Sequence, residues 1–340
     1  MSLLRGVSAV AFACAIFSAP TFAAIPAQER QVLLDLYTST NGAGWTDHTG
    51  WNGNAGTECG WFGVTCGIPD HVTAIDLPAN HLVGTLPAIN ALSELVQVDV
   101  AGNTLSGTLP SLSGLSSLQI VYFHNNQFTG SIPSLAGLSS LRTFYVVSNQ
   151  LTGTIPSLSG LTSLDVVSFA NNGLSGPLPD LTGLTTLRDI DFTNNQLTGP
   201  IPPLSSLTNL TGFEASSNPL GGSIPPLPSS MVTFLVGGSN LSGELPDLSN
   251  LHSLLYLWVS QNQLTGSVPD LSNTALVSLE IDHNQFSGVL PNPPASLTAQ
   301  SAIICPNNNL EPVDNAAWDV ATGETPWWMS CDRFFANGFE

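Results

Sequence analysis

The chain of 340 residues contains no lysine, and its permanently cationic side chains are five arginines. Only 9% of the residues are charged, and the formal net charge is −19. A surface so poor in cations cannot neutralise phosphate groups, so we expect no nucleic-acid partner. Binding to anionic membrane surfaces is disfavoured for the same reason.

Long apolar runs are missing after the first 23 residues, so we expect no transmembrane segment. The N-terminus itself combines Arg5, an apolar run over 7–17 and small residues up to Ala23. This order is typical of a signal peptide cleaved after Ala23. We therefore predict a signal peptide over 1–23 and a protein that is secreted or held at the cell surface.

Cysteine is scarce, with five in the whole chain, of which four follow the predicted signal peptide. An even number of cysteines in an exported chain favours two disulfides. Proximity in the sequence pairs Cys59 with Cys66 and Cys305 with Cys331, although four cysteines allow three connectivities. The sequence contains no Walker loop, nucleophile elbow or H-E-x-x-H motif, so we predict no cofactor and no metal site.

What the sequence has in abundance is an internal repeat. An asparagine recurs two positions before a Leu or Phe, and the step from Asn80 to Asn218 is always 23 residues. The later steps vary between 21 and 24 residues, and Ser239 occupies one position. The repeated positions, which predict about eleven turns, are Asn80, Asn103, Asn126, Asn149, Asn172, Asn195, Asn218, Ser239, Asn262, Asn284 and Asn308.

Apolar residues stand three and five positions before each asparagine, as Val121 and Phe123 do before Asn126. This alternation predicts a short strand with one buried face. Such a strand cannot bury its face alone, but stacked copies form one continuous core. We expect the asparagine amide to bond backbone groups of neighbouring turns, and Ser239 to be a weaker link in that ladder.

After the asparagine the chain follows the pattern x-Leu-x-Gly-x-(Ile/Leu/Val)-Pro, as in residues 150–156. This pattern over 72–310 resembles the leucine-rich repeat of the plant-type extracellular class. The stretch Cys-Gly-Trp-Phe-Gly-Val-Thr-Cys over 59–66 resembles the N-terminal cap of that class. The resemblance implies an α/β-type repeat solenoid, a right-handed superhelix with a parallel concave β-sheet and few or short helices. The class usually runs one residue longer per turn, which affects curvature rather than fold.

Both ends of the solenoid need covers, because an open end exposes the core. We predict an N-terminal cap over 24–71, with a helix over 26–37 whose apolar face is Val32, Leu33, Leu36 and Tyr37. A C-terminal cap and tail are predicted over 311–340. The tryptophans expected to cover the two ends are Trp45, Trp51, Trp61, Trp318, Trp327 and Trp328; stacking on a sugar is the alternative role for them.

Residues four positions before each asparagine are predicted to face outward from the concave sheet. In order they are Asp76, Asp99, Tyr122, Tyr145, Ser168, Asp191, Glu214, Leu235, Trp258, Glu280 and Ile304. Positions beside them add His124, Asp189, Tyr256 and Asp282. Exposed Tyr and Trp on a rigid sheet are typical recognition anchors, and carboxylates favour a basic or hydroxyl-rich partner. Our candidate binding residues are Tyr122, His124, Tyr145, Asp191, Glu214, Tyr256, Trp258 and Glu280.

We therefore predict a binding protein rather than an enzyme, with a protein, peptide or polysaccharide on the concave face. The resemblance adds the inhibition of a secreted hydrolase as a role. A glycoside hydrolase using Asp191 and Glu214 is disfavoured, because an open sheet offers no pocket that would raise a carboxyl pKa.

Two minor hypotheses concern calcium and water. Carboxylates around Asp189 could gather oxygen ligands for calcium. The threonines Thr129, Thr152 and Thr198 could order water, although Ser106 and Ser175 interrupt their series. The oligomeric state and the role of the C-terminal FFANGFE sequence stay open.

Overall fold

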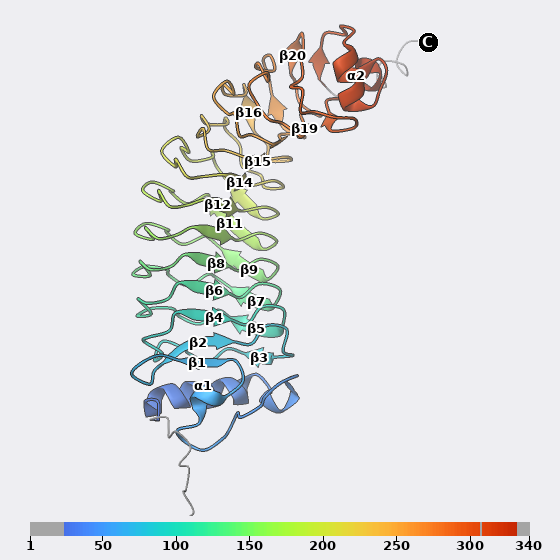
Figure 1. Cartoon of the computed structure of the whole chain (residues 1–340). Coiled ribbons are helices and arrows are strands. Elements are labelled where there is room, and N and C mark those ends of the chain that lie inside the picture. Colours follow the sequence, from blue (N-terminus) through green and yellow to red (C-terminus); the bar gives the residue numbers. More distant parts are fainter. Residues whose placement is uncertain (1–23, 307, 332–340) are drawn as a thin grey trace, which may run out of the picture.

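A computed structural model describes residues 24–306 and 308–331. The predicted signal peptide and the C-terminal FFANGFE sequence lie outside these residues. Figure 1 shows one elongated stack of turns, with the helix α1 (Ala27–Ser39) at one end and α2 (Ala316–Thr322) at the other. The turns stack straight from α1 to about β12 and lean over beyond β14.

The main sheet has twelve strands, of which β1 comes from the N-terminal cap and each of the other eleven from one turn of the solenoid. All its pairings are parallel except that of β1 with β2. The strands, in spatial order, are β1 (Val64–Cys66), β2 (Val72–Asp76), β4 (Gln97–Asp99), β6 (Ile120–Tyr122), β8 (Thr143–Tyr145), β10 (Val166–Ser168), β12 (Asp189–Asp191), β14 (Gly212–Glu214), β15 (Thr233–Leu235), β17 (Tyr256–Trp258), β19 (Ser278–Glu280) and β21 (Ala302–Ile303).

A second sheet of six parallel strands follows the asparagine positions of the first turns. Its strands are β3 (Val83–Thr85), β5 (Thr104–Thr108), β7 (Gln127–Gly130), β9 (Gln150–Gly153), β11 (Gly173–Pro177) and β13 (Gln196–Thr198). Two later strand pairs continue it, β16 (Ser242–Gly243) with β18 (Gln263–Leu264) and β20 (Ser287–Gly288) with β22 (Asn309–Leu310). The repeat glycine turns the chain at a positive φ, 75° at Gly130, that residues with a Cβ rarely adopt.

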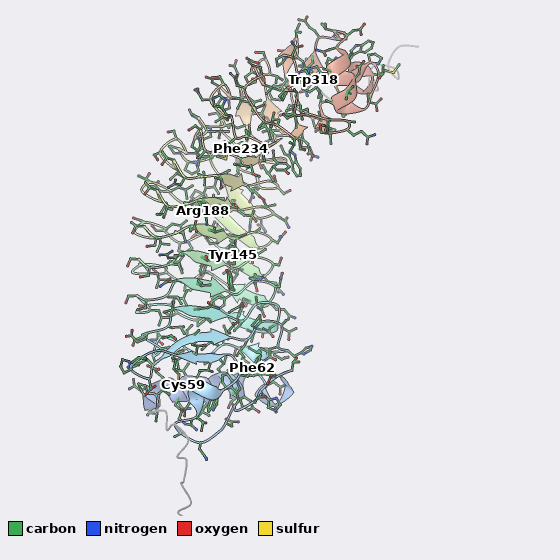
Figure 2. The ribbon with its side chains drawn as sticks, in the orientation of Figure 1. Cys59, Phe62, Tyr145, Arg188, Phe234 and Trp318 are labelled. Carbon is green, nitrogen blue, oxygen red and sulfur yellow. A yellow bond between two sulfur atoms is a disulfide. The ribbon has the colours of Figure 1, made fainter. Side chains whose placement is uncertain are left out.

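The core runs without interruption along the stack. The residues three and five positions before the asparagines from Asn80 to Asn284 are buried as predicted, with Val121 and Phe123 both 0% exposed; before Asn308 the fifth position, Ile303, is exposed. A column of phenylalanine rings continues through successive turns at centroid separations of 5.7–6.1 Å, from Phe144 through Phe169, Phe192 and Phe213 to Phe234. Figure 2 shows Phe234 near the point where the stack leans over.

The asparagine ladder is present, and Asn195 illustrates its contacts. Its amide nitrogen donates to the carbonyls of Phe169, Phe192 and Thr193 at 3.0–3.2 Å, and its amide oxygen accepts from Leu174 N at 3.0 Å. One side chain thus satisfies backbone groups in two turns where the strands end. Ser239 makes fewer contacts than the asparagines, as predicted, because its hydroxyl donates only to the Ala215 and Gly237 carbonyls. The Leu220 N–H, whose counterparts in other turns donate to an asparagine amide oxygen, donates to Asn218 O.

Replacing Asn195 by alanine should lower the free energy of unfolding, because it leaves buried backbone groups without partners. Each such group costs about 1–3 kcal/mol. The midpoint of urea unfolding, followed by circular dichroism, measures the effect. The neighbouring exposed Gln196→Ala is the control and should change the midpoint little; equal effects of the two variants would contradict a structural role for the ladder.

The N-terminal cap covers the first turn with aromatic rings, as predicted. Trp45, Trp51 and Trp61 are all buried, with centroids 4.9 Å and 5.1 Å apart along the series. Helix α1 ends two residues later than expected, at Ser39, and buries Val32, Leu33 and Leu36. Because the three rings are buried, they cannot stack on a sugar.

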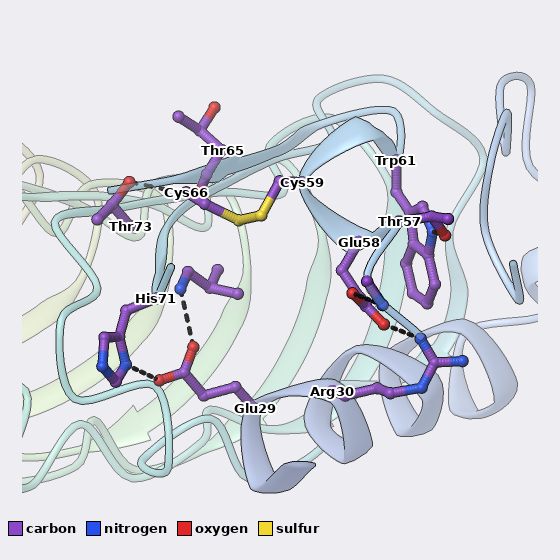
Figure 3. The surroundings of a disulfide bond; sticks show 12 residues. Glu29, Arg30, Thr57, Glu58, Cys59, Trp61, Thr65, Cys66, His71 and Thr73 are labelled. Carbon is purple, nitrogen blue, oxygen red and sulfur yellow. Dashed lines mark hydrogen bonds and ion pairs between the residues drawn. A yellow bond between two sulfur atoms is a disulfide. The ribbon is translucent and has the colours of Figure 1, made fainter. Parts of the chain in front are cut away.

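Polar contacts lock α1 onto the sheet beside the Cys59–Cys66 disulfide (Figure 3). The buried Glu29 accepts from Val72 N at 2.8 Å and contacts His71 Nδ1 at 2.5 Å. This hydrogen bond raises the pKa of His71. Arg30 pairs with Glu58, which is also buried.

The C-terminal cap closes the other end around α2 and the Cys305–Cys331 disulfide. Trp318 and Trp327 are buried, and their ring N–H groups donate to the carbonyls of Pro291 and Val313. Trp328 packs on the core while partly exposed. Both disulfide pairings predicted from sequence proximity are therefore confirmed.

Candidate functional site

One outward-facing residue from each of the ten consecutive strands from β2 to β19 of the main sheet forms a continuous series, which we call the concave column. Strand register places these residues next to one another in the order Asp76, Asp99, Tyr122, Tyr145, Ser168, Asp191, Glu214, Leu235, Trp258 and Glu280. The order predicted from the repeat is correct for these ten positions. It is wrong at the last one: Ile303, not Ile304, pairs with Glu280 and is exposed, while Ile304 is buried. The last step is 24 residues, with its extra residue between strand and asparagine, so counting back four residues from Asn308 stops one residue short of the strand position.

Three aromatic side chains of the predicted set meet on β6 and β8, and we call them the aromatic cluster. The rings of Tyr122 and Tyr145 are 5.4 Å apart, and His124 lies 5.7 Å and 6.1 Å from them, edge-on to both. All three side chains are half-buried, and the Nδ1 atom of His124 is buried without a hydrogen-bond partner. The cluster therefore presents a fixed aromatic surface on the concave face.

Beside this cluster the concave face is hollowed. The hollow has a volume of about 240 Å³ and is lined by Tyr145, Ser168, Asp189, Asp191 and Glu214, together with Val147, Val166 and Val167. We call it the acidic hollow. The Ser168 hydroxyl donates to Asp191 at 2.9 Å. Gly212 makes room for Asp189, because a Cβ added there would lie 2.7 Å from its carboxylate oxygen.

Burial and mutual repulsion raise the pKa values of two carboxyl groups in this hollow. The pKa of Glu214 is raised to about 7, first by burial and then by the charges of Asp191 and Asp189. Burial and Asp191 raise the pKa of Asp189 in the same direction. The expectation that an open sheet cannot raise a carboxyl pKa was therefore wrong. Burial is the larger cause for both carboxyls, because the walls of the hollow hold Asp189 and Glu214 partly out of water.

The remaining predicted residues lie further along the column, beyond Leu235. A second hollow of about 200 Å³ is lined by Trp258, Glu280, Gly237, Ser260 and neighbouring residues, and we call it the tryptophan hollow. Trp258 is fixed by a 2.9 Å hydrogen bond from its ring nitrogen to Ser278. Tyr256, on the same strand, is 38% exposed. The candidate residues thus form two groups rather than one site.

Sequence reasoning missed the residues that shape the acidic hollow. The repeat pattern placed Ser168 in the outward-facing series between Tyr145 and Asp191 without assigning it a role, and it gave no role to Gly212. Small residues facing the same side on the two strands that flank β12 are the signal that predicts such a depression. Within 24–306 and 308–331, no group of three or more His, Cys, Asp or Glu side chains is placed to hold a metal ion, so the calcium hypothesis gains no support.

Glu214→Gln should stabilise the protein more at pH 8 than at pH 5. The pKa of Glu214 is higher in the folded state than in the unfolded chain, so the folded state holds its proton more tightly. Its ionisation therefore costs stability that returns as the pH falls from above 7 toward 4.5. The difference in Tm between variant and wild type, measured at both pH values, checks this. Asp247→Asn, at an exposed turn, is the control, and a Glu214→Gln effect independent of pH would contradict the raised pKa.

Comparison with known families agrees with this architecture. Residues 26–67 match the leucine rich repeat N-terminal domain, and residues 117–138 match the leucine rich repeat. The protein is a leucine-rich-repeat solenoid with a cysteine-containing N-terminal cap, and it resembles the plant-type extracellular class of such proteins. None of the helices in the described part of the chain is long and apolar enough to cross a membrane.

Solved structures similar to this chain are mostly plant receptor ectodomains. The ectodomain of the receptor kinase GASSHO1/SCHENGEN3 from Arabidopsis thaliana is 27% identical, with a TM-score of 0.68 over 86% of this chain and 38% of its own. A TDR receptor is 33% identical, with a TM-score of 0.63 over 69% of this chain and 43% of its own. The chain thus spans less than half of these receptor structures. A plant ice-binding protein shares the fold at 23% identity and a TM-score of 0.69, over 84% of this chain and 96% of its own. No curated protein matches the chain.

Proposed function

We propose that the protein is a secreted or surface-exposed binding protein whose concave face recognises a protein or peptide. The observation that carries this proposal is the concave column, in which an aromatic cluster, the acidic hollow and the tryptophan hollow lie on one rigid sheet. Half-buried aromatic rings held by their neighbours are typical of interaction hot spots. The GASSHO1/SCHENGEN3 ectodomain was solved in complex with CASPARIAN STRIP INTEGRITY FACTOR 2, which supports a recognition role for this architecture.

A binding role fits the concave face better than catalysis does. Glu214 has a pKa suited to proton transfer, but its hollow is open to solvent and lies on a surface without a covering segment. The regular repeat also places these carboxylates beside the aromatic side chains, on the same face of the sheet. Inhibition of a secreted hydrolase would use that surface with an enzyme as the partner. Hydrolysis of a glycan that is lost in Glu214→Gln would instead favour a glycoside hydrolase.

Simultaneous replacement of Tyr122, Tyr145 and Trp258 by alanine should abolish capture of the partner, because all three supply apolar contact area on the concave face. A pull-down from extracellular proteins, followed by binding measured on the captured protein, tests this. The matched control replaces Thr162, Thr185 and Thr208, which are exposed at equivalent positions of three return segments. Unchanged affinity of a folded concave variant would place the binding site elsewhere.

Ice binding is a second candidate function, favoured by the outer surface of β3, β5, β7, β9, β11 and β13. We call this surface the hydroxyl face. Its six strands contain no charged residue, although the protein carries 24 acidic ones. Their one aromatic residue, Phe128, is buried, so the face lacks the rings on which sugars stack. A neutral surface of this kind suits ordered water better than a charged or carbohydrate partner.

The hydroxyls of this face lie in two columns, one interrupted at Val83 and the other at Pro177. In one column Thr129 and Ser106 both donate to the glycine carbonyl of the preceding turn, at 3.3 Å and 3.2 Å, so serine keeps the contact that threonine makes. In a second column each side chain lies over the next repeat glycine. A Cβ at Gly130 would come within 3.0 Å of the Thr108 methyl. Both columns repeat at the strand spacing of about 4.8 Å.

Thermal hysteresis of the purified protein tests the hydroxyl face. Replacing Thr129, Thr152 and Thr198 by lysine should abolish it, because charged side chains disrupt an ordered water layer. The same substitution at Thr162, Thr185 and Thr208 adds equal charge elsewhere and should leave it intact. Wild-type protein without thermal hysteresis, or adsorption to cellulose rather than to ice, would overturn this second function.

A further inference from the structure

We infer that the acidic hollow binds a cationic side chain, arginine in the first place, carried by an extended peptide or a protein segment on the concave face. This inference rests on the proposed function and names the chemistry of its partner. It begins from the composition of the hollow's wall, which combines one aromatic ring with three carboxylates.

The aromatic ring and the carboxylates that line the hollow can both contact the same organic cation. Tyr145 is held in place by Tyr122 and His124, so its ring is a fixed surface. A guanidinium or ammonium group over such a ring gains a cation–π interaction. Asp189, Asp191 and Glu214 supply acceptors on adjacent strands, and a planar guanidinium can bond two oxygens at once. Arginine therefore fits this combination better than lysine.

The hollow has no cation of its own among its lining residues. Arg188, on the rim, is engaged with Asp165 through a 2.6 Å hydrogen bond and a second, shorter contact. Arg142 is exposed, and neither arginine lines the hollow. The chain cannot supply a lysine, since it has none. The three carboxylates are thus lined up with no cation in the wall of the hollow, although the charge of Arg188 outside it acts on Asp189. A cation bound in the hollow would favour the ionised form of Glu214 and so oppose the rise in its pKa.

A metal ion is a poorer occupant than an organic cation. The three carboxylates do not converge in the way a metal site requires, as the absence of such a group among the described residues shows. The volume of about 240 Å³ is large for one bare ion and sufficient for the end of an arginine side chain. The geometry therefore selects a wide, flat cation over a small spherical one.

The column also predicts a second anchor in the partner, an apolar side chain near the arginine. Asp191 and Trp258 lie on β12 and β17, separated by three strand spacings, or about 14 Å. An extended peptide covers that distance in about four residues. A partner with arginine in the acidic hollow would therefore place an apolar side chain against Trp258 roughly four residues away.

Isothermal titration with a hexa-arginine peptide and its neutral hexa-citrulline counterpart tests the inference. Wild-type protein should bind the arginine peptide and not the citrulline one. Asp189→Asn with Glu214→Gln should weaken binding at least about tenfold, because it removes buried charge partners. The control, Asp247→Asn with Asp270→Asn, makes the same change in net charge at exposed turns and should bind like wild type.

Acidification provides a second readout. Affinity of the wild type should fall between pH 8 and pH 6, as Glu214 takes up a proton near pH 7, and this fall should be smaller in Glu214→Gln. Asp189, Asp191 and Tyr145 are the other titratable groups that line the hollow with Glu214. Equal weakening by the two double variants, equal binding of both peptides, or no binding at all would overturn the inference. The proposed function has a separate test, the alanine variant of Tyr122, Tyr145 and Trp258. If the arginine peptide does not bind but this variant loses capture of the partner, the inference fails and the proposed function stands.

Discussion

The structure depends on the hydrogen bonds that one asparagine side chain makes between adjacent turns. Each turn of the solenoid bends where a strand ends, and the bend leaves backbone donors and acceptors inside the protein. A buried polar group without a partner costs more free energy than most single contacts supply. An amide has two donors and an oxygen, so it can satisfy several of these groups at once, as Asn195 does across two turns.

That constraint fixes the register, and the register creates the functional surfaces. Because every turn must place its asparagine in the same way, residues at equal distances from it stand in straight columns on the sheet. Apolar columns fill the core, and the columns beside them face solvent. Residues outside the buried columns and the asparagine positions are free to vary from turn to turn, so different aromatic and acidic side chains can stand side by side on the concave face.

The two exposed sheets differ in charge as well as in shape. The concave face gathers carboxylates around Tyr145, while the strands of the hydroxyl face hold no charge. Glycine has a different use on each. At Gly212 it leaves space for a carboxylate, whereas at Gly130 it turns the chain and receives the methyl of Thr108. One scaffold therefore presents two chemically distinct surfaces.

The periodic spacing of asparagine, leucine and glycine was sufficient to predict the solenoid, the buried columns and the order of ten positions along the concave face, because each turn solves the same local packing problem. Proximity alone paired the cysteines, since each pair flanks a short cap. Two features depended on the tertiary structure. The position of Ile303 follows from an extra residue before Asn308 that the repeat count could not place. The acidic hollow lies where the small residues Ser168 and Gly212 flank the strand β12, which carries Asp189 and Asp191. The raised pKa of Glu214 comes from burial and from the charges of Asp191 and Asp189, and these groups belong to different turns, so no single repeat contains the site.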